Sequence, residues 1–393
     1  MAIMRWKKLL SPDRLGKGKS SQTDVRSNYQ RDFDRIVFCS AFRRLQDKTQ
    51  VFPLAESDYV RTRLTHSIEV ASVGRSLGAL IGKLVMSRET LDDVETSDFG
   101  SIVAAACLAH DIGNPPFGHS GEKAISEWFL VSGRSYLRGL TKQQRADLTK
   151  FEGNAQGFRI ITRLQNSINK GGLQLTYATL GAFTKYPKAS FVFGIDGKRK
   201  SRKISEKKFG FFSDDDASFS EVAKSLGLLQ KKKGAWVRHP LAFLVEAADD
   251  ICYRIVDFED GYRLGRVTFE DAEKLLRKLA LSDEGGMNSD IRIENKGQIE
   301  LLRALAINNL IYQVKDVFEK NYEKILNGTF ETDLISETES HQVLSEIAAA
   351  SREKVYGTPS VLQIEAAGFG VLGGLLSLFA PVFVFPESRL MDW

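Results

Sequence analysis

Two adjacent residues, His110 and Asp111, are the strongest candidates for chemistry in this sequence. They lie in a run, residues 107–119, whose glycine and proline residues end a helix directly after them. Histidine and aspartate both bind divalent metals, and neighbours that do so together usually serve a catalytic ion with open coordination positions. Of five histidines in the chain, three (positions 66, 110 and 119) fall within 54 residues. The pair therefore predicts a metal-dependent hydrolase.

Further ligands to such an ion must come from other helices. His66 opens an apolar helical pattern, where a lone histidine is more often a packed residue than a metal ligand. Its assignment as a ligand is therefore supported only by the other candidates. An oxygen donor is expected from residues 244–257, where Asp249, Tyr253 and Asp257 lie four apart and would share one helix face. Such charges are costly on an apolar stretch unless they are paired or metal-bound, whereas Asp250 is expected on a salt-bridged surface. Two histidines and two aspartates suit Mg²⁺, Mn²⁺, Co²⁺ or Fe²⁺ better than a structural zinc.

Most of the elements that must position these residues are predicted to be helices. Apolar residues recur with a helical period in residues 26–52, 65–86, 100–110, 121–130, 154–164, 241–262, 271–279 and 298–326. Strand-like signal is confined to residues 190–212, where 191–193 and 209–212 lie on either side of a turn-like 194–197. We therefore predict an all-α fold with a small β-containing excursion.

One large domain, residues 1–393, fits the length, with an inserted basic excursion at 187–235 and a C-terminal helical extension at 265–393. The basic runs, one at 198–203 with Lys207 and Lys208 and another at 231–233, are interpreted as a solvated loop. The alternative is contact with a nucleic-acid backbone such as single-stranded DNA, and the net charge of +5 is too small to decide.

The composition indicates a soluble cytoplasmic protein. The chain is 42% hydrophobic, and its N-terminus has no apolar stretch long enough for a signal peptide. Its three cysteines form no CxxC pair and favour free thiols in a reducing compartment. Residues 366–385 are apolar enough to span a bilayer, but their glycines and Pro381 favour a buried helix followed by a turn and a strand. We expect no membrane span.

The order His66, His110-Asp111, Asp249 resembles the H…HD…D signature of HD-domain phosphohydrolases. Longer runs narrow the resemblance to the bacterial deoxyguanosine-triphosphate triphosphohydrolase (dGTPase) family. They are residues 35–38, 41–53, 61–70, 110–122, 151–156 and 246–253, with a weaker echo at 361–369. The HD pair alone is a weak signal, but the whole set in this order is specific.

The resemblance implies an all-α HD fold that hydrolyses deoxynucleoside triphosphates (dNTPs), dGTP favoured, at the α-phosphate, releasing deoxynucleoside and inorganic triphosphate. It implies a homo-oligomer, with a hexamer as one candidate. By position, the resemblance assigns the metal ligands to His66, His110, Asp111 and Asp249. His119 would be the general acid, oriented by Glu122. Contacts with the substrate would come from Gln50 and Asp257 at the 3′-hydroxyl, from Tyr253 at the deoxyribose and from Arg63 at the phosphates. The segment 151–153 departs from the family pattern because it carries no histidine, so the acid role would rest on His119 alone.

Elementary chemistry is consistent with these roles. A triphosphate requires cations, and Arg61 and Arg63 precede the first ligand. A histidine that titrates near neutrality suits proton donation to a leaving alkoxide. Two alternatives remain: an HD phosphohydrolase of nucleoside monophosphates or cyclic nucleotides, and a nucleotide-sensing protein that binds nucleic acid.

Overall fold

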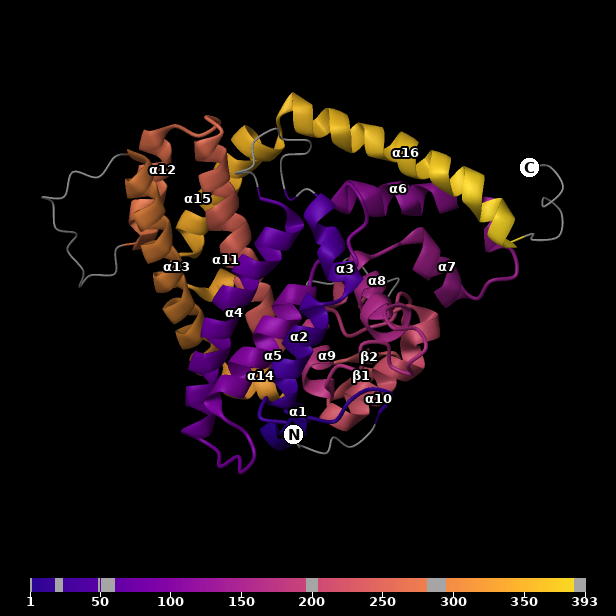
Figure 1. The fold of residues 1–393 in the computed structure, drawn as a ribbon, viewed down its shortest axis with the longest axis horizontal. Helices are drawn as coiled ribbons and strands as arrows, with labels where there is room; N and C mark the ends of the chain where they lie inside the picture. Colours follow the sequence, from indigo (N-terminus) through magenta and orange to yellow (C-terminus); the bar gives the residue numbers. More distant parts are fainter. Residues whose placement is uncertain are drawn as a thin grey trace, which may run out of the picture.

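The computed structural model describes residues 2–17, 24–48, 50, 61–195, 204–280 and 295–384, and these residues form a predominantly helical molecule (Figure 1). The α-helices are α1 (Trp6–Leu9), α2 (Asn28–Val37), α3 (Ser40–Arg43), α4 (Arg63–Met86), α5 (Thr96–Ala109), α6 (Gly118–Leu130), α7 (Lys142–Thr149), α8 (Gly153–Arg159), α9 (Tyr177–Phe183), α10 (Asp216–Leu226), α11 (Pro240–Arg263), α12 (Phe269–Ala280), α13 (Asn295–Lys320), α14 (Tyr322–Leu326), α15 (His341–Ser351) and α16 (Pro359–Val384). The predicted all-α fold class is confirmed.

The centre of the molecule is the pair α4 and α5, with α11 packed against both. Glycines on α4 allow the close approach: a Cβ atom at Gly74 would lie 2.5 Å from Sγ of Cys107, and one at Gly78 would lie 2.6 Å from the carbonyl oxygen of Phe99. Helix α5 is buried along almost its whole length, as its apolar sequence requires. This close packing fixes the two helix ends that carry His66 and His110.

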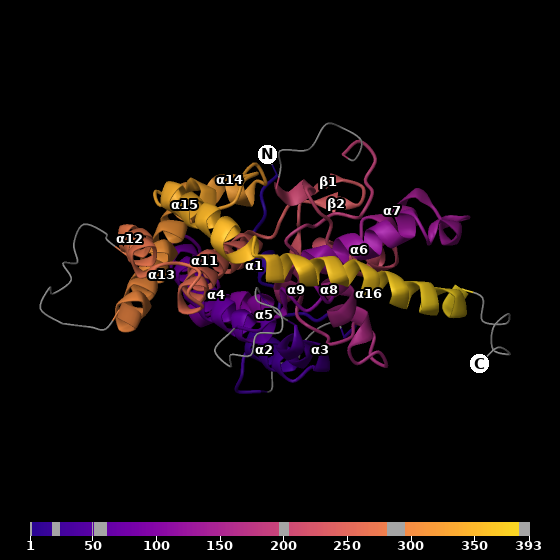
Figure 2. The same cartoon turned by 90° about the horizontal axis from the view of Figure 1, so that it is seen from above.

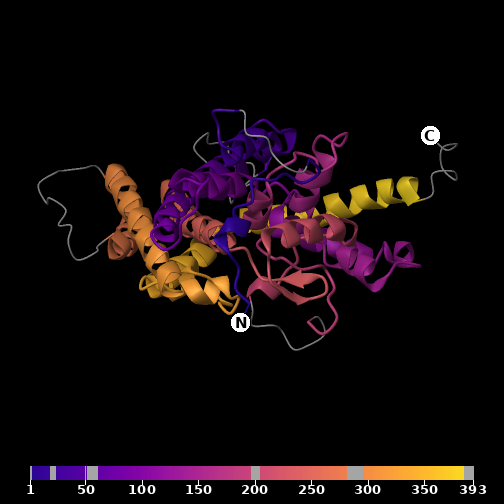
Figure 3. The ribbon, with the colours of Figure 1, turned by 90° about the horizontal axis from the view of Figure 1, so that it is seen from below.

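The remaining helices surround this centre. Helices α2 and α9 cover α5, while α13 packs on α4, α11 and α12. Figures 2 and 3, seen from above and below, show α12 and α13 on one side of the molecule and α16 extending on the other. One large hydrophobic cluster runs from Trp6 through α5 and α11 to Val361.

The predicted helices are confirmed with three kinds of difference. The segment 26–52 is broken: α2 ends at Val37, α3 follows at Ser40–Arg43, and a 3-10 turn covers Arg44–Asp47, while residues 49 and 51–52 lie outside the described part. Short or weakly periodic helices such as α7, α9, α10 and α15 were not expected. Single turns of π-helix at Ile160–Leu164 and Arg352–Tyr356 extend α8 and α15.

The predicted positions of the strands are wrong. The described residues contain one two-stranded antiparallel sheet, formed by β1 (Gln230–Lys232) and β2 (Ala235–Trp236). The aromatic run at 209–212 contributes one isolated bridge, Ala189 with Phe211. Its side chains enter the core instead, because Phe211 stacks on Phe219 and lies beside Trp236. The basic run 198–203 lies outside the described residues, and Lys231–Lys233 lie on this small hairpin.

The apolar C-terminal segment forms one long helix, α16, and the expectation of a buried helix followed by a turn and a strand is wrong for the described residues. Helix α16 packs along α6 (Figure 1). Large apolar side chains such as Phe369, Leu375 and Phe379 remain 37–51% exposed. By length and composition alone, residues Val361–Val382 could cross a membrane. Of the 18-residue stretch of this helix that meets that test, only 17% is buried.

Candidate metal centre

Three helices bring the predicted ligands together. His66 lies in the first turn of α4, His110 caps the C-terminus of α5 with Asp111 directly after it, and Asp249 lies midway along α11. The Oδ1 atom of Asp249 is 3.2 Å from Nε2 of His66 and 3.5 Å from Nε2 of His110. One ligand atom from each of His66, His110 and Asp111 lies within 4.8 Å of the others. These four side chains therefore form one cluster.

The local structure explains how the histidines are aimed. The N-cap residue Thr62 accepts a hydrogen bond from the amide of Thr65 and so begins α4 just before His66. In α5 the ring atom Nδ1 of His110 lies 2.6 Å from the carbonyl oxygen of Cys107. A donor hydrogen on Nδ1 leaves Nε2 unprotonated and directed at the cluster, the usual orientation of a ligating imidazole.

The aspartates are held in their ionised form. Burial works to raise the pKa of Asp111, but the guanidinium of Arg63, followed by the imidazoles of His110 and His66 in their protonated forms, lowers it to about 2. Burial likewise opposes ionisation of Asp249, and His110, His66 and Lys185 outweigh it and hold its pKa below the usual range. Two carboxylates and two imidazoles in one buried cluster fit a hard or borderline divalent cation. The described residues therefore could hold a metal ion.

Arg63 lies between this cluster and the turn that precedes His119. Its Nη1 atom donates to Oδ2 of Asp111 at 2.6 Å. On its other side, a Cβ atom at Gly118 would lie 2.8 Å from Nη2 of Arg63. The guanidinium of Arg63 thus lies between the predicted metal ligand Asp111 and Gly118, the residue before His119. At this position it can bind an anion.

His119 and Glu122 form a pair on the first turn of α6. The Nδ1 atom of His119 lies 2.8 Å from Oε2 of Glu122, and the His119 side chain is 76% exposed. The other carboxylate oxygen of Glu122 accepts a hydrogen bond from the amide of Gly153 at 2.7 Å. Burial opposes ionisation of Glu122, but His119, Lys208 and the Gly153 amide lower its pKa. The carboxylate can therefore orient the imidazole with Nε2 free.

Lys208 is a residue near this pair that the sequence did not single out. Its Nζ atom lies 3.6 Å from Oε2 of Glu122 and 2.9 Å from Oε1 of Glu152. It also lines a cavity of about 670 Å³ that opens beside His119. In the sequence Lys208 belongs to the basic excursion, so its charge resembled that of a solvated loop. The aromatic residues that follow it and enter the core were the available signal.

The α11 face carries the next two predicted residues. Asp257 is fully buried, and burial raises its pKa to about 7. Its Oδ2 atom accepts a hydrogen bond from the hydroxyl of Tyr356 at 3.0 Å, whereas its Oδ1 atom has no hydrogen-bond partner among the described residues. The ring of Tyr253 stacks on that of Tyr356, with centroids 5.5 Å apart. Oε1 of Gln50 is a second buried acceptor without a partner in the described part of the chain.

Tyr356 is the other residue that the sequence did not reveal. It lies 99 positions after Asp257, in the π-helical turn beyond α15. No local pattern marks it. Asp250 also differs from expectation, because it is part-buried with its pKa raised to about 7 by burial, and no ion pair to it is present among the described residues.

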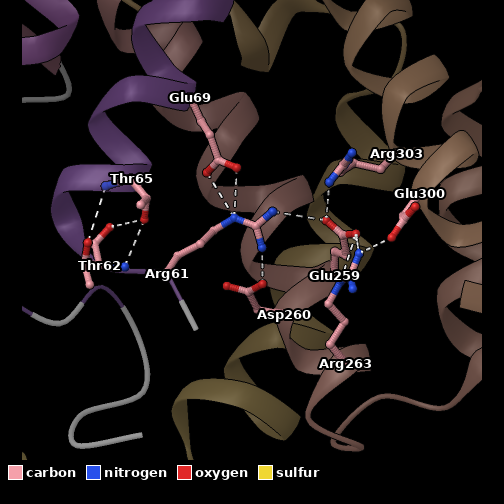
Figure 4. A network of polar contacts seen from close by, with 9 residues as sticks. All are labelled: Arg61, Thr62, Thr65, Glu69, Glu259, Asp260, Arg263, Glu300 and Arg303. Carbon is pink, nitrogen blue, oxygen red and sulfur yellow. Dashed lines mark hydrogen bonds and ion pairs between the residues drawn. The ribbon is translucent and has the colours of Figure 1, made fainter. Parts of the chain in front are cut away.

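Arg61, two residues before α4 begins, links Glu69 of α4 to acidic residues of α11 (Figure 4). Its guanidinium forms ion pairs with Glu69 at 2.9 Å, with Glu259 at 3.4 Å, and with Asp260. Glu259 is fully buried and is also paired with Arg263 and Arg303. Three carboxylates therefore surround the charge of Arg61, whereas Arg63 is the arginine that contacts the predicted metal ligand Asp111.

Comparisons with known proteins agree with this geometry. The HD domain family matches residues 63–166, which include His66, His110 and Asp111. A deoxyguanosinetriphosphate triphosphohydrolase-like protein of Synechocystis sp. is 45% identical, with 98% of this chain and 88% of the relative aligned. Proteins of the same name in Pseudomonas aeruginosa and Listeria monocytogenes are 40% and 37% identical, over 96% and 98% of this chain and 85% and 86% of theirs. The matched domain and the similarity over nearly all of this chain support a phosphohydrolase, and the chain belongs to the deoxyguanosinetriphosphate triphosphohydrolase-like family of HD-domain proteins.

Proposed function

We propose that this protein hydrolyses dNTPs, with dGTP favoured, at the α-phosphate and releases the deoxynucleoside and inorganic triphosphate. The observation that carries the proposal is the metal cluster together with the polar side chains that accompany it. Oδ1 of Asp257, on the helix that carries Asp249, is a buried acceptor without a partner among the described residues and suits a sugar hydroxyl, and Oε1 of Gln50 is a second such acceptor. An exposed histidine backed by a carboxylate, His119 with Glu122, suits a leaving oxygen.

The four ligands His66, His110, Asp111 and Asp249 would hold a divalent ion such as Mg²⁺, Mn²⁺, Co²⁺ or Fe²⁺. Such an ion, when bound, supplies positive charge at the phosphate and lowers the pKa of water. Arg63 would bind phosphate oxygens, since an arginine beside a buried cluster presents several donors to an anion.

The other residues would orient the substrate and move a proton. Water adds to the α-phosphorus and gives up a proton while the bond from phosphorus to the 5′-oxygen breaks, and that oxygen takes up a proton, so the number of protons is conserved. His119 donates the proton to that oxygen from Nε2, while Glu122 stabilises the protonated ring at Nδ1. Tyr253 packs under the deoxyribose and excludes a 2′-hydroxyl, because a crowded polar group without a partner carries a large penalty.

Product analysis tests the proposal directly. The protein is incubated with each dNTP, with GTP and with a cyclic nucleotide, in Mg²⁺ or Mn²⁺, and the products are separated by anion-exchange chromatography. We expect deoxyguanosine and triphosphate from dGTP and at least about tenfold less from GTP. Monophosphate with pyrophosphate, or free phosphate, contradicts the proposal and favours another HD phosphohydrolase. We place this activity in the cytoplasm, where its substrates occur.

A further inference from the structure

The side chain of Lys208 lies between two buried carboxylates. Its Nζ atom is 2.9 Å from Oε1 of Glu152 and 3.6 Å from Oε2 of Glu122. The two glutamate side chains are only 8% and 9% exposed, whereas that of Lys208 is 30% exposed. Buried carboxylates are costly without an opposite charge, and here one cation serves two of them. The position of Lys208 therefore affects both glutamates.

Apolar packing fixes Lys208 in this position. The next residue, Phe209, is buried in a small apolar cluster with Ala155, and Phe151 packs against that cluster. Phe151 directly precedes Glu152 in the sequence. The cluster therefore holds Lys208 and Glu152 side by side, and Lys208 is a fixed part of the site although it follows a basic loop.

One oxygen of Glu122 serves both Lys208 and His119. Oε2 lies 2.8 Å from Nδ1 of His119 and 3.6 Å from Nζ of Lys208, while Oε1 accepts a hydrogen bond from the amide of Gly153. A carboxylate beside an imidazole stabilises its protonated form, and a nearby cation opposes this effect. The two charges around Oε2 together decide how readily a protonated His119 releases its proton.

We propose that Lys208 is a positioning residue that shares the Glu122 carboxylate with His119, so that this carboxylate orients the imidazole without retaining its proton. This role rests on the proposed function, in which His119 donates a proton to the leaving 5′-oxygen. Glu152 holds Lys208 in place through the shorter of the two ion pairs. Lys208 acts through Glu122 and contacts no reacting atom.

Other charged groups also face His119. Those that line its cavity or lie against its turn are Lys123 and Glu127 of α6, Lys150 and Arg63. Phe369 of α16 lines the cavity too, but residues 366–384 carry no charge. All these groups are the same in wild type and in a Lys208 variant. A difference between the two therefore belongs to Lys208 and its two carboxylates.

Loss of Lys208 is expected to make His119 a weaker acid. Burial, together with the charge of Glu122, raises the pKa of Glu152 even beside the lysine. For Glu122 the effect of burial is outweighed by His119, Lys208 and the Gly153 amide, and its pKa is lowered. Without the lysine, Glu152 therefore takes up a proton and Glu122 stays ionised. A carboxylate that is no longer shared then holds the protonated imidazole more tightly.

The first test does not depend on turnover. The imidazole signals of His119 are followed against pH by NMR in full-length, histidine-labelled protein with Mg²⁺, and His119→Gln identifies them. In Lys208→Met we expect their titration midpoint to move to higher pH by at least about 0.5. The matched control Lys207→Met, at the exposed neighbouring position, should leave the midpoint within about 0.2 of wild type, since solvent screens its charge. An unchanged midpoint in Lys208→Met, or an equal shift in both variants, overturns the proposal.

A second variant tests the same relationship with the opposite sign. Glu152→Gln removes the shorter ion pair and leaves the charge of Lys208 to Glu122 alone. We expect the His119 midpoint to move to lower pH, because the protonated imidazole then competes with a lysine that no longer pairs with Glu152. This variant decides the matter where Lys208→Met loses its helical circular dichroism. Shifts of the same sign in Lys208→Met and Glu152→Gln overturn the proposal.

Kinetics show whether Lys208 acts through Glu122. Lys208→Met should lower kcat for dGTP about three- to tenfold and change KM less than about twofold, and Lys208→Arg should restore most of kcat. The double variant Lys208→Met, Glu122→Gln should lose no more than Glu122→Gln alone, because the carboxylate that couples the two is gone. Losses that multiply, or a raised KM at unchanged kcat, would make Lys208 a direct ligand of the phosphates and overturn the proposal.

The two kinds of measurement separate this proposal from the proposed function. If wild-type protein releases no triphosphate from dGTP, the proposed function fails, whatever the NMR titrations show. If triphosphate is released but the His119 midpoints do not move as expected, the function stands and the role of Lys208 is wrong.

Discussion

The Oδ1 atom of Asp249 lies 3.2 Å from Nε2 of His66, although 183 positions separate the two residues. The same oxygen is 3.5 Å from Nε2 of His110, so one carboxylate contacts histidines from both α4 and α5. No hydrogen bond or ion pair joins the adjacent Asp250 to either histidine among the described residues. Position 249, and not 250, therefore completes the cluster.

Replacement of Asp249 by alanine should remove the bound metal and lower turnover of dGTP at least about 100-fold, because the cluster loses its contact with α11. Metal content by plasma mass spectrometry and product formation by chromatography measure the two effects. Asp250→Ala is the matched control and should retain the metal. Loss of metal in Asp250→Ala alone would show that the assignment on this helix is off by one residue.

Glu122→Gln should lower kcat roughly 10²- to 10⁴-fold, the range of a lost proton-transfer contribution, while the metal content stays unchanged. The amide keeps the size of the side chain but removes the negative charge that faces Nδ1 of His119. His119→Gln should produce a loss of the same order. Glu127→Gln, on the same helix and cavity, is the control and should retain wild-type kcat. Equal activity of Glu122→Gln and wild type would exclude the orienting role.

Burial raises the pKa of Asp257 from 3.8 to about 7, so between about pH 4 and pH 7 the folded protein binds a proton that the unfolded chain has released. The contribution of Asp257 to stability is therefore largest at low pH and is lost as the pH rises toward 7. In metal-free protein, Asp257→Asn should reduce the fall in unfolding free energy between pH 5 and pH 7.5 by on the order of 1–4 kcal/mol. Urea unfolding at the two pH values measures it.

Two comparisons make the Asp257 measurement specific. Asp250 and Asp260 have raised pKa values from burial as well, so the wild-type pH dependence contains their contributions, and only the difference from Asp257→Asn belongs to Asp257. Asp316→Asn, whose side chain is 70% exposed, should leave the pH dependence unchanged. The same slope in wild type and Asp257→Asn would rule out a raised pKa at this site.

Arg61→Gln should destabilise the protein by about 3–5 kcal/mol, because it leaves the carboxylates of Glu259 and Asp260 buried with one fewer cation. Arg26→Gln breaks pairs with Asp24 and Asp34 at a side chain that is 57% exposed, where solvent screens the charges, and should leave the stability nearly unchanged. Chemical denaturation compares the two. Similar costs for both would mean that the network of Figure 4 does not join the helices.

The helices that carry the site could be predicted because their sequences have strong periodicity or near-continuous apolar character. Asp249, Tyr253 and Asp257 were assigned to one helix from their spacing, and all three lie on α11. The strands could not be placed, because Phe191, Phe209 and Phe211 suit a strand or a core equally well. Tertiary packing decided the outcome, as the stacking of Phe211 on Phe219 shows.

Contacts across long sequence separations were beyond local patterns. Tyr356 contacts Asp257 from a π-helical turn, a feature without a sequence signature. The ion pairs of Arg61 were hidden in the sequence as well. An arginine close in sequence to a histidine ligand could bind phosphate, and only the structure shows that Glu259 and Asp260 lie around it. The composition of α16 indicated an apolar helix. It could not indicate how much of that helix is exposed, because exposure depends on which other elements pack against it.

The turn before His119 holds Phe117 in the left-handed region, with φ of 66°, a strained conformation for a residue other than glycine. Its ring fits against Gly368 of α16, where a Cβ atom would lie 2.7 Å from its Cγ atom. Helix α16 is translated after every residue of the metal cluster, so a nascent chain holds all four candidate ligands before this turn can have its support. If the protein acts as proposed, we expect a ribosome-bound chain that lacks α16 to bind the ion without turning over nucleotide.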